Sequence, residues 1–207
     1  MHVWADTVGM AIDGGLRERK KIETRSALTA AALRLAVERG LDHVTAEDIA
    51  AEAGVSVRTF FNYFATKEAA FVDDDLERGR RFVATVAAAP LDTPVWALLH
   101  RTAVTTLATD DLSTREQQLK EQLIRTSPAL VSEVLATFGR LEAELVVELA
   151  RRTAPSSALH SRLLATSVVA AVRAATETWL DSENADTDLF LTLLDEALTA
   201  LAPAFAP

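Results

Sequence analysis

Helical periodicity runs through most of the chain, and its prolines fall where that periodicity is interrupted. Pro90 follows one apolar helical segment, and Pro94, Pro128 and Pro155 open others. Proline is tolerated in the first turn of a helix because the N–H that it lacks has no helical partner there. No segment shows the two-residue alternation of a strand, and none repeats at a spacing of about 20 to 50 residues. We therefore predict an all-α fold.

The periodic segments predict about nine helices in two domains. Residues 1–16 end in Gly14-Gly15 and are expected to form a flexible extension. A small helical domain is expected over residues 17–66, and a larger one over residues 67–207. The expected helices, bounded by capping residues, glycines and prolines, cover residues 17–39, 46–54, 57–63, 67–89, 94–109, 113–126, 128–153, 155–181 and 189–201. Ser56 and Thr66 are the expected N-cap residues of the helices that begin at residues 57 and 67.

The composition and motifs of the chain exclude several kinds of functional site. The chain has no cysteine, which excludes disulfides, thiolate metal ligands and a thiol nucleophile. Its four histidines are scattered without metal-ligand spacing, and it has no Gly-rich phosphate loop or nucleophile elbow. We therefore expect no catalytic residue, no metal site and no cofactor, and so no enzyme. The absence of a signal-peptide pattern and of an apolar run of about 18 residues predicts a cytoplasmic protein that does not enter a membrane.

Charge is distributed unevenly along the sequence. The formal net charge is −9, yet residues 17–67 carry nine Lys or Arg against seven Asp or Glu. The rest of the chain is therefore strongly acidic. A basic N-terminal quarter can approach a phosphate backbone while an acidic body points away from it. Ordinary scatter of surface charge explains the same difference equally well. The charge distribution alone therefore does not distinguish a DNA-facing segment from an ordinary protein surface.

The segment over residues 46–64 has the pattern of two short helices joined by a tight turn. Thr45 begins a capping-box pattern that opens the first helix. Gly54 stands where the turn needs a positive φ, which glycine adopts at low cost. Phe60 and Phe64, four residues apart, can anchor the second helix on a core. This pattern predicts a helix-turn-helix. A plain helical hairpin with a polar surface is the alternative.

The second of these helices leaves polar side chains on its outer face. Arg58 can fork onto a guanine edge, and Thr59 and Asn62 can bond base edges or phosphates. The methyl groups of Val57 can contact the methyl group of thymine. The side chains expected to contact phosphate oxygens are those of Ser56, Tyr63 and Lys67.

Residues 24–71 closely resemble the N-terminal domain of TetR-family regulators. The resemblance rests on Thr24-Arg25-Ser26-Ala27-Leu28, Thr45-Ala46-Glu47-Asp48-Ile49-Ala50, Ala53-Gly54-Val55-Ser56, Phe60-Phe61-Asn62-Tyr63-Phe64 and Lys67-Glu68. Gly-Val-Ser, followed by an aromatic cluster and then Lys-Glu, is distinctive of that family. A basic run precedes these motifs and consists of Arg17, Arg19, Lys20, Lys21 and Arg25. The rest of the chain agrees with the family only in length and number of helices.

The resemblance implies a ligand-responsive transcriptional regulator that binds operator DNA. By the habit of the family, a repressor released by a small and apolar effector is favoured over an activator. Thr45, Ser56, Tyr63 and Lys67 match positions that contact phosphate, whereas Phe61 replaces a usual Tyr and loses its hydroxyl contact. The complete expected DNA-binding set is Arg25, Thr45, Ser56, Val57, Arg58, Thr59, Asn62, Tyr63 and Lys67.

The resemblance also implies that the middle helices of the larger domain enclose a small-molecule pocket. The residues expected to line it are Phe82, Trp96, His100, Phe138, Arg173 and Trp179. The many Ala, Val and Leu residues indicate an apolar ligand. Aromatic residues on an apolar helix face are, however, more often part of a core.

The last two long helices, expected over residues 155–181 and 189–201, have broad apolar faces. The resemblance implies that they form the interface of a homodimer, which fits faces wider than one neighbouring helix covers. Core packing within one chain is the alternative. A helical lipid- or ligand-binding module without DNA binding is the competing function, and the basic residues Arg58 and Lys67 argue against it.

Overall fold

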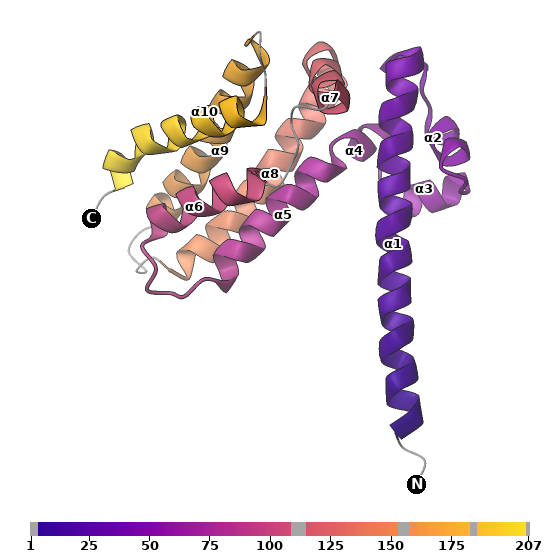
Figure 1. The fold of residues 1–207 in the computed structure, drawn as a ribbon, viewed down its shortest axis with the longest axis horizontal. Coiled ribbons are helices and arrows are strands. Elements are labelled where there is room, and N and C mark those ends of the chain that lie inside the picture. The colour runs from indigo at the N-terminus through magenta and orange to yellow at the C-terminus, as the bar shows by residue number, and fades with distance from the viewer. Residues whose placement is uncertain (1–3, 109–114, 153–157, 183–185, 206–207) are drawn as a thin grey trace. The chain divides into compact units, whose positions relative to one another are not determined.

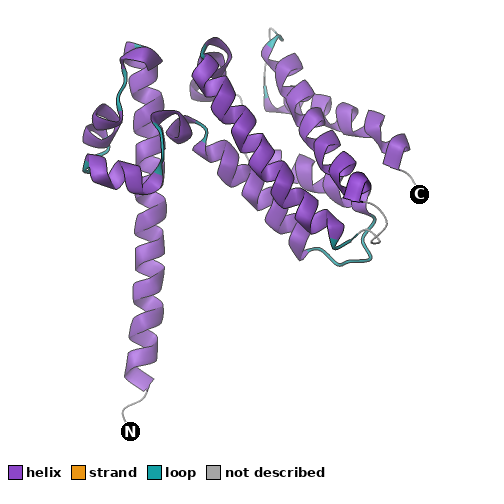
Figure 2. Ribbon diagram, turned by 180° about the vertical axis from the view of Figure 1, so that it is seen from behind, coloured by secondary structure: helices purple, strands orange, loops and turns teal. Residues whose placement is uncertain are grey.

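The computed structural model describes residues 4–108, 115–152, 158–182 and 186–205. Over these ranges it contains α-helices, two short 3-10 helices and no strand (Figure 1, Figure 2), which confirms the all-α prediction. The α-helices are α1 (Trp4–Arg39), α2 (Ala46–Glu52), α3 (Val57–Tyr63), α4 (Lys67–Phe71), α5 (Asp73–Ala88), α6 (Val95–Leu107), α7 (Arg115–Thr126), α8 (Pro128–Ala150), α9 (Ala158–Leu180) and α10 (Thr187–Leu201). The 3-10 helices are η1 (Leu41–His43) and η2 (Ala202–Phe205). The chain divides into two compact units, Met1–Asp73 and Asp74–Pro207.

The first helix begins earlier than predicted. α1 starts at Trp4, so most of the segment expected to be a flexible extension is helical. Gly14 and Gly15 suggested that the helix begins only after them. Each glycine lowers the stability of a helix by only about 1 kcal/mol relative to alanine, which weakens the helix without breaking it. The other end agrees with the sequence. Gly40 has a φ of 82°, and its N–H donates to the carbonyl oxygen of Ala36 at 2.9 Å.

The C-terminal half of α1 builds the core of the first unit with α2, α3 and α4. α1 packs against α2 and α4, and α2 packs against α3. Apolar residues spaced three and four apart on α1 meet one apolar face from each short helix. The largest side chains buried there are Leu28, Leu35, Ile49, Phe60, Phe64 and Phe71.

The helix predicted over residues 67–89 is divided into α4 and α5. Thr66 caps α4 as expected, because its Oγ1 accepts a hydrogen bond from the N–H of Ala69 at 3.1 Å. Val72 then leaves helical geometry, with φ −103° and ψ 10°. Neither Gly nor Pro marks this interruption, so the sequence pattern does not reveal it. The chain passes from the first unit to the second after Asp73, seven residues beyond the domain boundary predicted between residues 66 and 67.

The second unit is a bundle of α5 to α10 around one core. α9 packs against α8 and α10, and α10 also packs against α6. The interior residues of the last two helices include Leu164, Val168, Trp179, Phe190, Leu194 and Leu198, all of which are buried against other helices of the same unit. Much of the apolar surface that predicted a dimer interface is therefore core within one chain. Leu159 and Leu163 of α9 remain exposed, at 68% and 48%.

Two contacts fix α5 within the second unit. Gly79 lies so close to α8 that a Cβ atom at this position would overlap the side chain of Leu141. At the end of α5, the guanidinium of Arg152 donates hydrogen bonds to the carbonyl oxygens of Val86, Ala89 and Pro90. It thereby satisfies carbonyl groups that the last turn of a helix leaves without N–H partners.

A buried ion pair joins α5 to α7. Nζ of Lys120 lies 2.8 Å from Oδ2 of Asp75, and a guanidinium nitrogen of Arg78 lies 3.0 Å from Oδ1 of the same carboxylate. Burial raises the pKa of Asp75, but the positive charges of Lys120 and Arg78 outweigh it and hold the pKa below its ordinary value. The pKa of Lys120 is raised, because attraction to Asp75 outweighs the opposing effect of burial.

Over the described ranges, every helix is too short or too polar to cross a membrane.

Candidate nucleic-acid interface

The predicted helix-turn-helix is formed by α2, a tight turn and α3. Gly54 occupies the turn with φ 69°, as its place in the motif requires. The N–H of Val55 donates to the carbonyl oxygen of Ala50 at 2.9 Å, which closes the turn. Ile49 of α2 and Phe60 of α3 are fully buried. The side of α3 opposite Phe60 is therefore held outward by a rigid core.

The outer face of α3 carries the residues predicted to read DNA. Arg58 and Asn62 are exposed, and Val57 and Thr59 are partly exposed at the beginning of the helix. Phe61 is 53% exposed on the same short helix. The guanidinium of Arg58 and the amide of Asn62 offer hydrogen-bond donors suited to base edges. α3 thus presents a polar face of the size that enters a major groove.

Side-chain hydroxyl groups cap the N-termini of α2 and α3. Oγ1 of Thr45 accepts a hydrogen bond from the N–H of Asp48 at 3.1 Å and donates to Oδ2 of Asp48 at 2.6 Å. The backbone N–H of Thr45 also donates to Oδ2 of Asp48, at 3.0 Å, and the two bonds that the carboxylate accepts from Thr45 lower the pKa of Asp48. Oγ of Ser56 accepts from the N–H of Thr59 at 3.1 Å. Thr45 and Ser56 therefore position the helices that bear the interface.

Two basic residues of the predicted set have partners within the first unit. Nζ of Lys67 donates to the carbonyl oxygens of Leu41 and Val44, at 3.1 and 2.8 Å. The guanidinium of Arg25 is paired with the buried carboxylate of Asp73. Arg25 and Asp73 are far apart in the chain and no local sequence pattern links them, so the sequence alone does not indicate this pair. Tyr63 is partly exposed at the end of α3.

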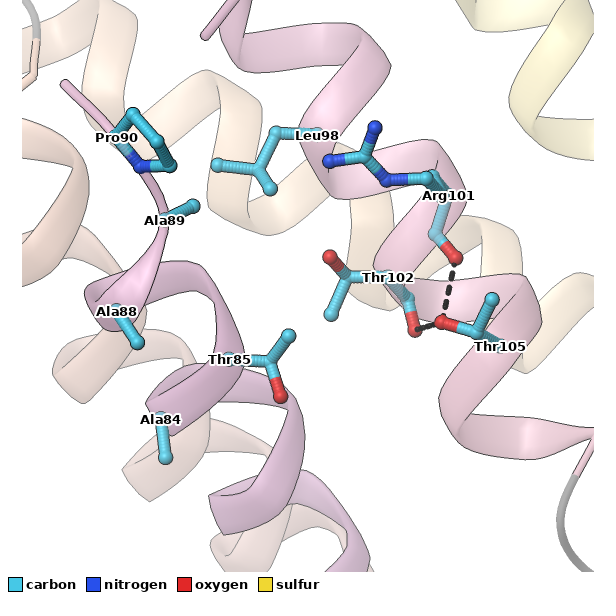
Figure 3. Close-up of a pocket in the computed structure, with 9 residues that line it drawn as sticks. All are labelled: Ala84, Thr85, Ala88, Ala89, Pro90, Leu98, Arg101, Thr102 and Thr105. Carbon is cyan, nitrogen blue, oxygen red and sulfur yellow. Dashed lines mark hydrogen bonds between the residues drawn. The ribbon is translucent and has the colours of Figure 1, made fainter.

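The second unit contains an open groove between the last turns of α5 and one side of α6 (Figure 3). Its volume is about 590 Å³. Apolar side chains line one part, while Arg101 and three threonines supply polar atoms. Oγ1 of Thr105 donates to the carbonyl oxygens of Arg101 and Thr102. The lining residues are Ala84, Thr85, Ala88, Ala89, Pro90, Leu98, Arg101, Thr102 and Thr105.

The six residues predicted to bind the effector do not line this groove. Trp96 is stacked on Phe205, with 4.6 Å between ring centroids. Nε2 of His100 lies 2.7 Å from Oδ1 of Asp195, which joins α6 to α10. Trp179 is buried, and its indole N–H donates to the carbonyl oxygen of Asp186 at 2.8 Å.

The other three predicted residues lie on different helices. Phe82 is packed against the core from α5, Phe138 is partly buried on α8, and Arg173 is exposed on α9. The groove was missed in the sequence because small residues such as alanine and threonine give no distinctive signal.

Both the N-terminal and the C-terminal part of the chain match known protein families. Residues 28–72 match the family described as "Bacterial regulatory proteins, tetR family", and residues 93–206 match the "MftR C-terminal domain". The HTH-type transcriptional regulator TcmR of Streptomyces glaucescens is 26% identical over 197 residues, covering 91% of this chain and 87% of TcmR.

Solved structures show the same fold at low sequence identity. NalD of Pseudomonas aeruginosa, the secondary repressor of the MexAB-OprM multidrug efflux pump, is 17% identical with a TM-score of 0.55, covering 88% of this chain and 96% of NalD. Thermus thermophilus FadR, in complex with lauroyl-CoA, is 18% identical with a TM-score of 0.51, covering 88% of this chain and 95% of FadR. With a matching helix-turn-helix and a matching C-terminal domain, the chain belongs to the TetR family of ligand-responsive, DNA-binding transcriptional regulators.

Proposed function

We propose that this regulator is a homodimeric repressor that leaves its operator when a small apolar molecule occupies the second unit. The observation that carries the DNA-binding part is the outer face of α3. Arg58 and Asn62 are exposed there, and the buried Phe60 holds that face outward. A rigid helix reads bases better than a flexible segment because less conformational entropy is lost on binding.

Base recognition is assigned to the first turns of α3. Arg58 forms a bidentate contact with guanine, and Asn62 bonds a base edge or a phosphate. Val57 and Thr59 supply methyl groups for thymine. The residues assigned to the phosphate backbone are Arg25, Thr45, Ser56, Tyr63 and Lys67. Lys67 retains one ammonium proton beyond its two carbonyl partners, and that proton is available to a phosphate oxygen.

The effector is proposed to be largely apolar. The groove between α5 and α6 is lined on one side by Ala84, Ala88 and Leu98, which favours hydrocarbon. Arg101 and Thr102 offer polar atoms for a head group. FadR of Thermus thermophilus, which has the same fold, holds lauroyl-CoA, a molecule with a long apolar chain.

Dimerisation is proposed through the exposed side of α9 with α10. Leu159 and Leu163 are large apolar residues that stay exposed in the single chain. Two copies of α3 must reach successive major grooves about 34–36 Å apart, or a multiple of that distance. A ligand that binds the DNA-competent dimer less well than another arrangement shifts the population away from the operator. By linkage, operator DNA weakens ligand binding by the same factor.

Operator binding titrated with effector tests this function. The operator is first selected from genomic fragments, and saturated fatty acids and acyl-CoA thioesters of graded chain length serve as probes. We expect tight, salt-dependent binding of the selected duplex and its loss when the probe saturates the protein. Failure to bind any duplex would favour the lipid-binding module without DNA. Tight probe binding with unchanged operator affinity would refute effector-driven release while leaving DNA binding intact.

A further inference from the structure

The two walls of the groove in the second unit differ in their chemistry. The α5 wall consists largely of alanine, whereas the α6 wall presents Arg101, Thr102 and Thr105 (Figure 3). Arg101 is exposed, and its guanidinium extends from α6 toward the α5 side of the groove. None of the nine described residues that line the groove is acidic. The α6 wall therefore carries a positive charge that no negative charge in this lining opposes.

Arg101 differs from most cations of the second unit. Residues 74–207 are acidic, with 12 Lys or Arg against 19 Asp or Glu. Most of the described arginines of this unit form ion pairs with neighbouring carboxylates, as Arg125 does with Asp181. Arg101 forms no ion pair within the described ranges. Its five N–H donors are therefore available to a molecule in the groove.

The hydroxyl of Thr102 is a second polar group that faces the groove. Thr85 and Thr105 also line it, but the hydroxyl of each donates to a carbonyl oxygen of its own helix at 2.8 Å. Thr102 is 2% exposed, and among the described residues its hydroxyl has no hydrogen-bond partner. Figure 3 shows this hydroxyl directed from α6 toward α5. A buried hydroxyl without a partner is unfavourable, and a ligand oxygen in the groove removes that cost.

The electrostatics of the α5 wall also favour a negative charge. The groove lies at the C-terminal end of α5, where free carbonyl groups carry the negative end of the helix dipole and repel anions. The guanidinium of Arg152 donates to the carbonyl oxygens of that end and brings a positive charge to it. Arg152 on one side and Arg101 on the other therefore raise the potential at the groove within an acidic unit.

From these observations we propose that the groove between α5 and α6 selects an apolar carboxylate, whose head group is bound by Arg101 and Thr102. A guanidinium binds a carboxylate through two parallel N–H···O bonds, and one guanidinium neutralises one negative charge. The hydrocarbon part lies against Ala84, Ala88 and Leu98. The groove volume of about 590 Å³ is within the usual range of small-molecule sites. The proposal rests on the proposed function and names the chemical class of its effector.

Three probes with the same hydrocarbon chain and different head groups test the charge of the occupant. Near neutral pH, decanoic acid is anionic, decanamide is neutral and decylamine is cationic. Each is titrated into the full-length protein by calorimetry, below the concentration at which it forms micelles. We expect decanoic acid to bind at least about tenfold more tightly than decanamide, which corresponds to about 1.4 kcal/mol, and decylamine to bind most weakly. Equal affinities for the acid and the amide overturn the proposal.

Substitutions in the groove locate the head group. Arg101→Gln should abolish the preference for the acid over the amide, and Arg101→Lys should keep part of it, because the charge remains while the bidentate geometry is lost. Thr102→Val, which has nearly the same shape, should weaken acid binding by about two- to tenfold. Arg125→Gln is the matched control, because it removes the same charge from an exposed site on α7 and should keep the wild-type preference. Circular dichroism checks that each variant is folded. An Arg101→Gln protein that keeps the full preference for the acid overturns the proposal.

Operator binding measured with the same probes separates this inference from the proposed function. Release of the operator by decanoic acid in the wild type, but not in Arg101→Gln, supports both. If the acid binds through Arg101 while the operator stays bound, effector-driven release fails and the selection of a carboxylate stands. If the acid and the amide bind equally well and both release the operator, the proposed function stands and this inference is overturned. Absence of binding by all three probes also overturns it.

Discussion

The guanidinium of Arg25 forms a bidentate contact with the carboxylate of Asp73, with Nε–Oδ2 and NH2–Oδ1 distances of 2.6 and 2.7 Å. The same guanidinium carbon lies 5.4 Å from the centroid of the Phe64 ring. Arg25 thus ties α1 to the last residue of the first unit and to the residue that follows α3. Its position in the predicted DNA-binding set is accompanied by a structural role that the sequence did not indicate.

Substitution of Arg25 should therefore lower stability as well as DNA affinity. Asp73 is 3% exposed, and removing its partner leaves a buried carboxylate without compensation. We expect Arg25→Ala to lower the free energy of unfolding by about 3 kcal/mol. Arg25→Lys keeps the charge but loses the bidentate geometry, and should fall between the two. Chemical denaturation of the three proteins measures this, and equal stability of Arg25→Ala and wild type would contradict it.

Arg58→Ala should relax base preference at one position of the operator. The side chain is exposed on α3, so its loss should leave the fold intact and remove one base-edge contact worth about 1–3 kcal/mol. Binding to a panel of single-base operator variants measures the change. Arg34→Ala is the control, because Arg34 is an exposed arginine of the same unit that pairs with Glu52. If both variants keep the wild-type profile, Arg58 does not read a base.

Leu163→Asp should produce monomers that remain folded. Leu163 is 48% exposed in the single chain, so a charge there disturbs a partner surface rather than the core. Leu91→Asp is the matched control, since Leu91 is 70% exposed outside α9 and α10. Sedimentation at micromolar concentration, with circular dichroism as a check on folding, separates the two. If the Leu163→Asp protein and the wild type sediment as the same species, this part of α9 does not form the proposed interface.

Two glycines in helix interiors should respond in opposite directions to alanine. A Cβ at Gly79 would overlap Leu141, whereas a Cβ at Gly139 meets no atom within 4 Å. Gly139→Ala should raise stability by about 0.5–1 kcal/mol, the usual gain in a helix. Gly79→Ala should lower it by about 1–3 kcal/mol, the usual cost of overpacking. Thermal denaturation of both variants measures the sign of each change. A stabilising Gly79→Ala would show that α5 and α8 can move apart with little loss of folding free energy.

The ion pair of Asp75 and Lys120 should make stability depend on pH at both extremes. The pKa of Asp75 is lowered from 3.8, so its contribution is present above that value and is lost as pH falls through the lowered pKa. The pKa of Lys120 is raised from 10.5, so its contribution is present below that value and is lost as pH rises through the raised pKa. Stability should therefore be nearly constant with respect to this pair between those limits.

Asp75→Asn tests the pair directly. It should cost about 3–5 kcal/mol near neutral pH, because Lys120 stays buried without its carboxylate. The difference from wild type should shrink in acid, where the wild type loses the same interaction. Asp181→Asn breaks the exposed pair with Arg125 and should cost at most about 1 kcal/mol. A pH-independent difference between Asp75→Asn and wild type would contradict the assignment.

Local signals predicted the first unit well. Thr45, Ser56 and Thr66 cap α2, α3 and α4 as the sequence indicates, because each bond links residues three apart. Gly54 adopts the positive φ that its place in the turn requires. Interactions between distant residues were not predictable. The Arg25–Asp73 pair and the carbonyl partners of Lys67 depend on how α1, α2 and α4 pack, and no short pattern encodes that.

The groove between α5 and α6 was the least predictable part of the structure for a physical reason. Large residues such as Trp96 and Trp179 attract attention in a sequence, but the structure uses them for stacking and core packing. A groove is made where side chains are small, and Ala84, Ala88 and Thr85 carry no signal of their own. Likewise, the faces of α9 and α10 could be recognised as apolar but not divided into core and surface without their neighbours.

The hydrogen bonds from Arg152 to the end of α5 have a mechanical consequence for the groove. Ala89 and Pro90 form part of its rim, and their carbonyl oxygens are bound from behind by a guanidinium at the end of α8. This rim is therefore a fixed wall. The opposite wall is also held in place, because α6 packs against α9 and α10 and its His100 is joined to Asp195 of α10. A molecule that enters the groove meets two walls that are both held from behind, so the groove should select its occupant by shape rather than widen to admit it.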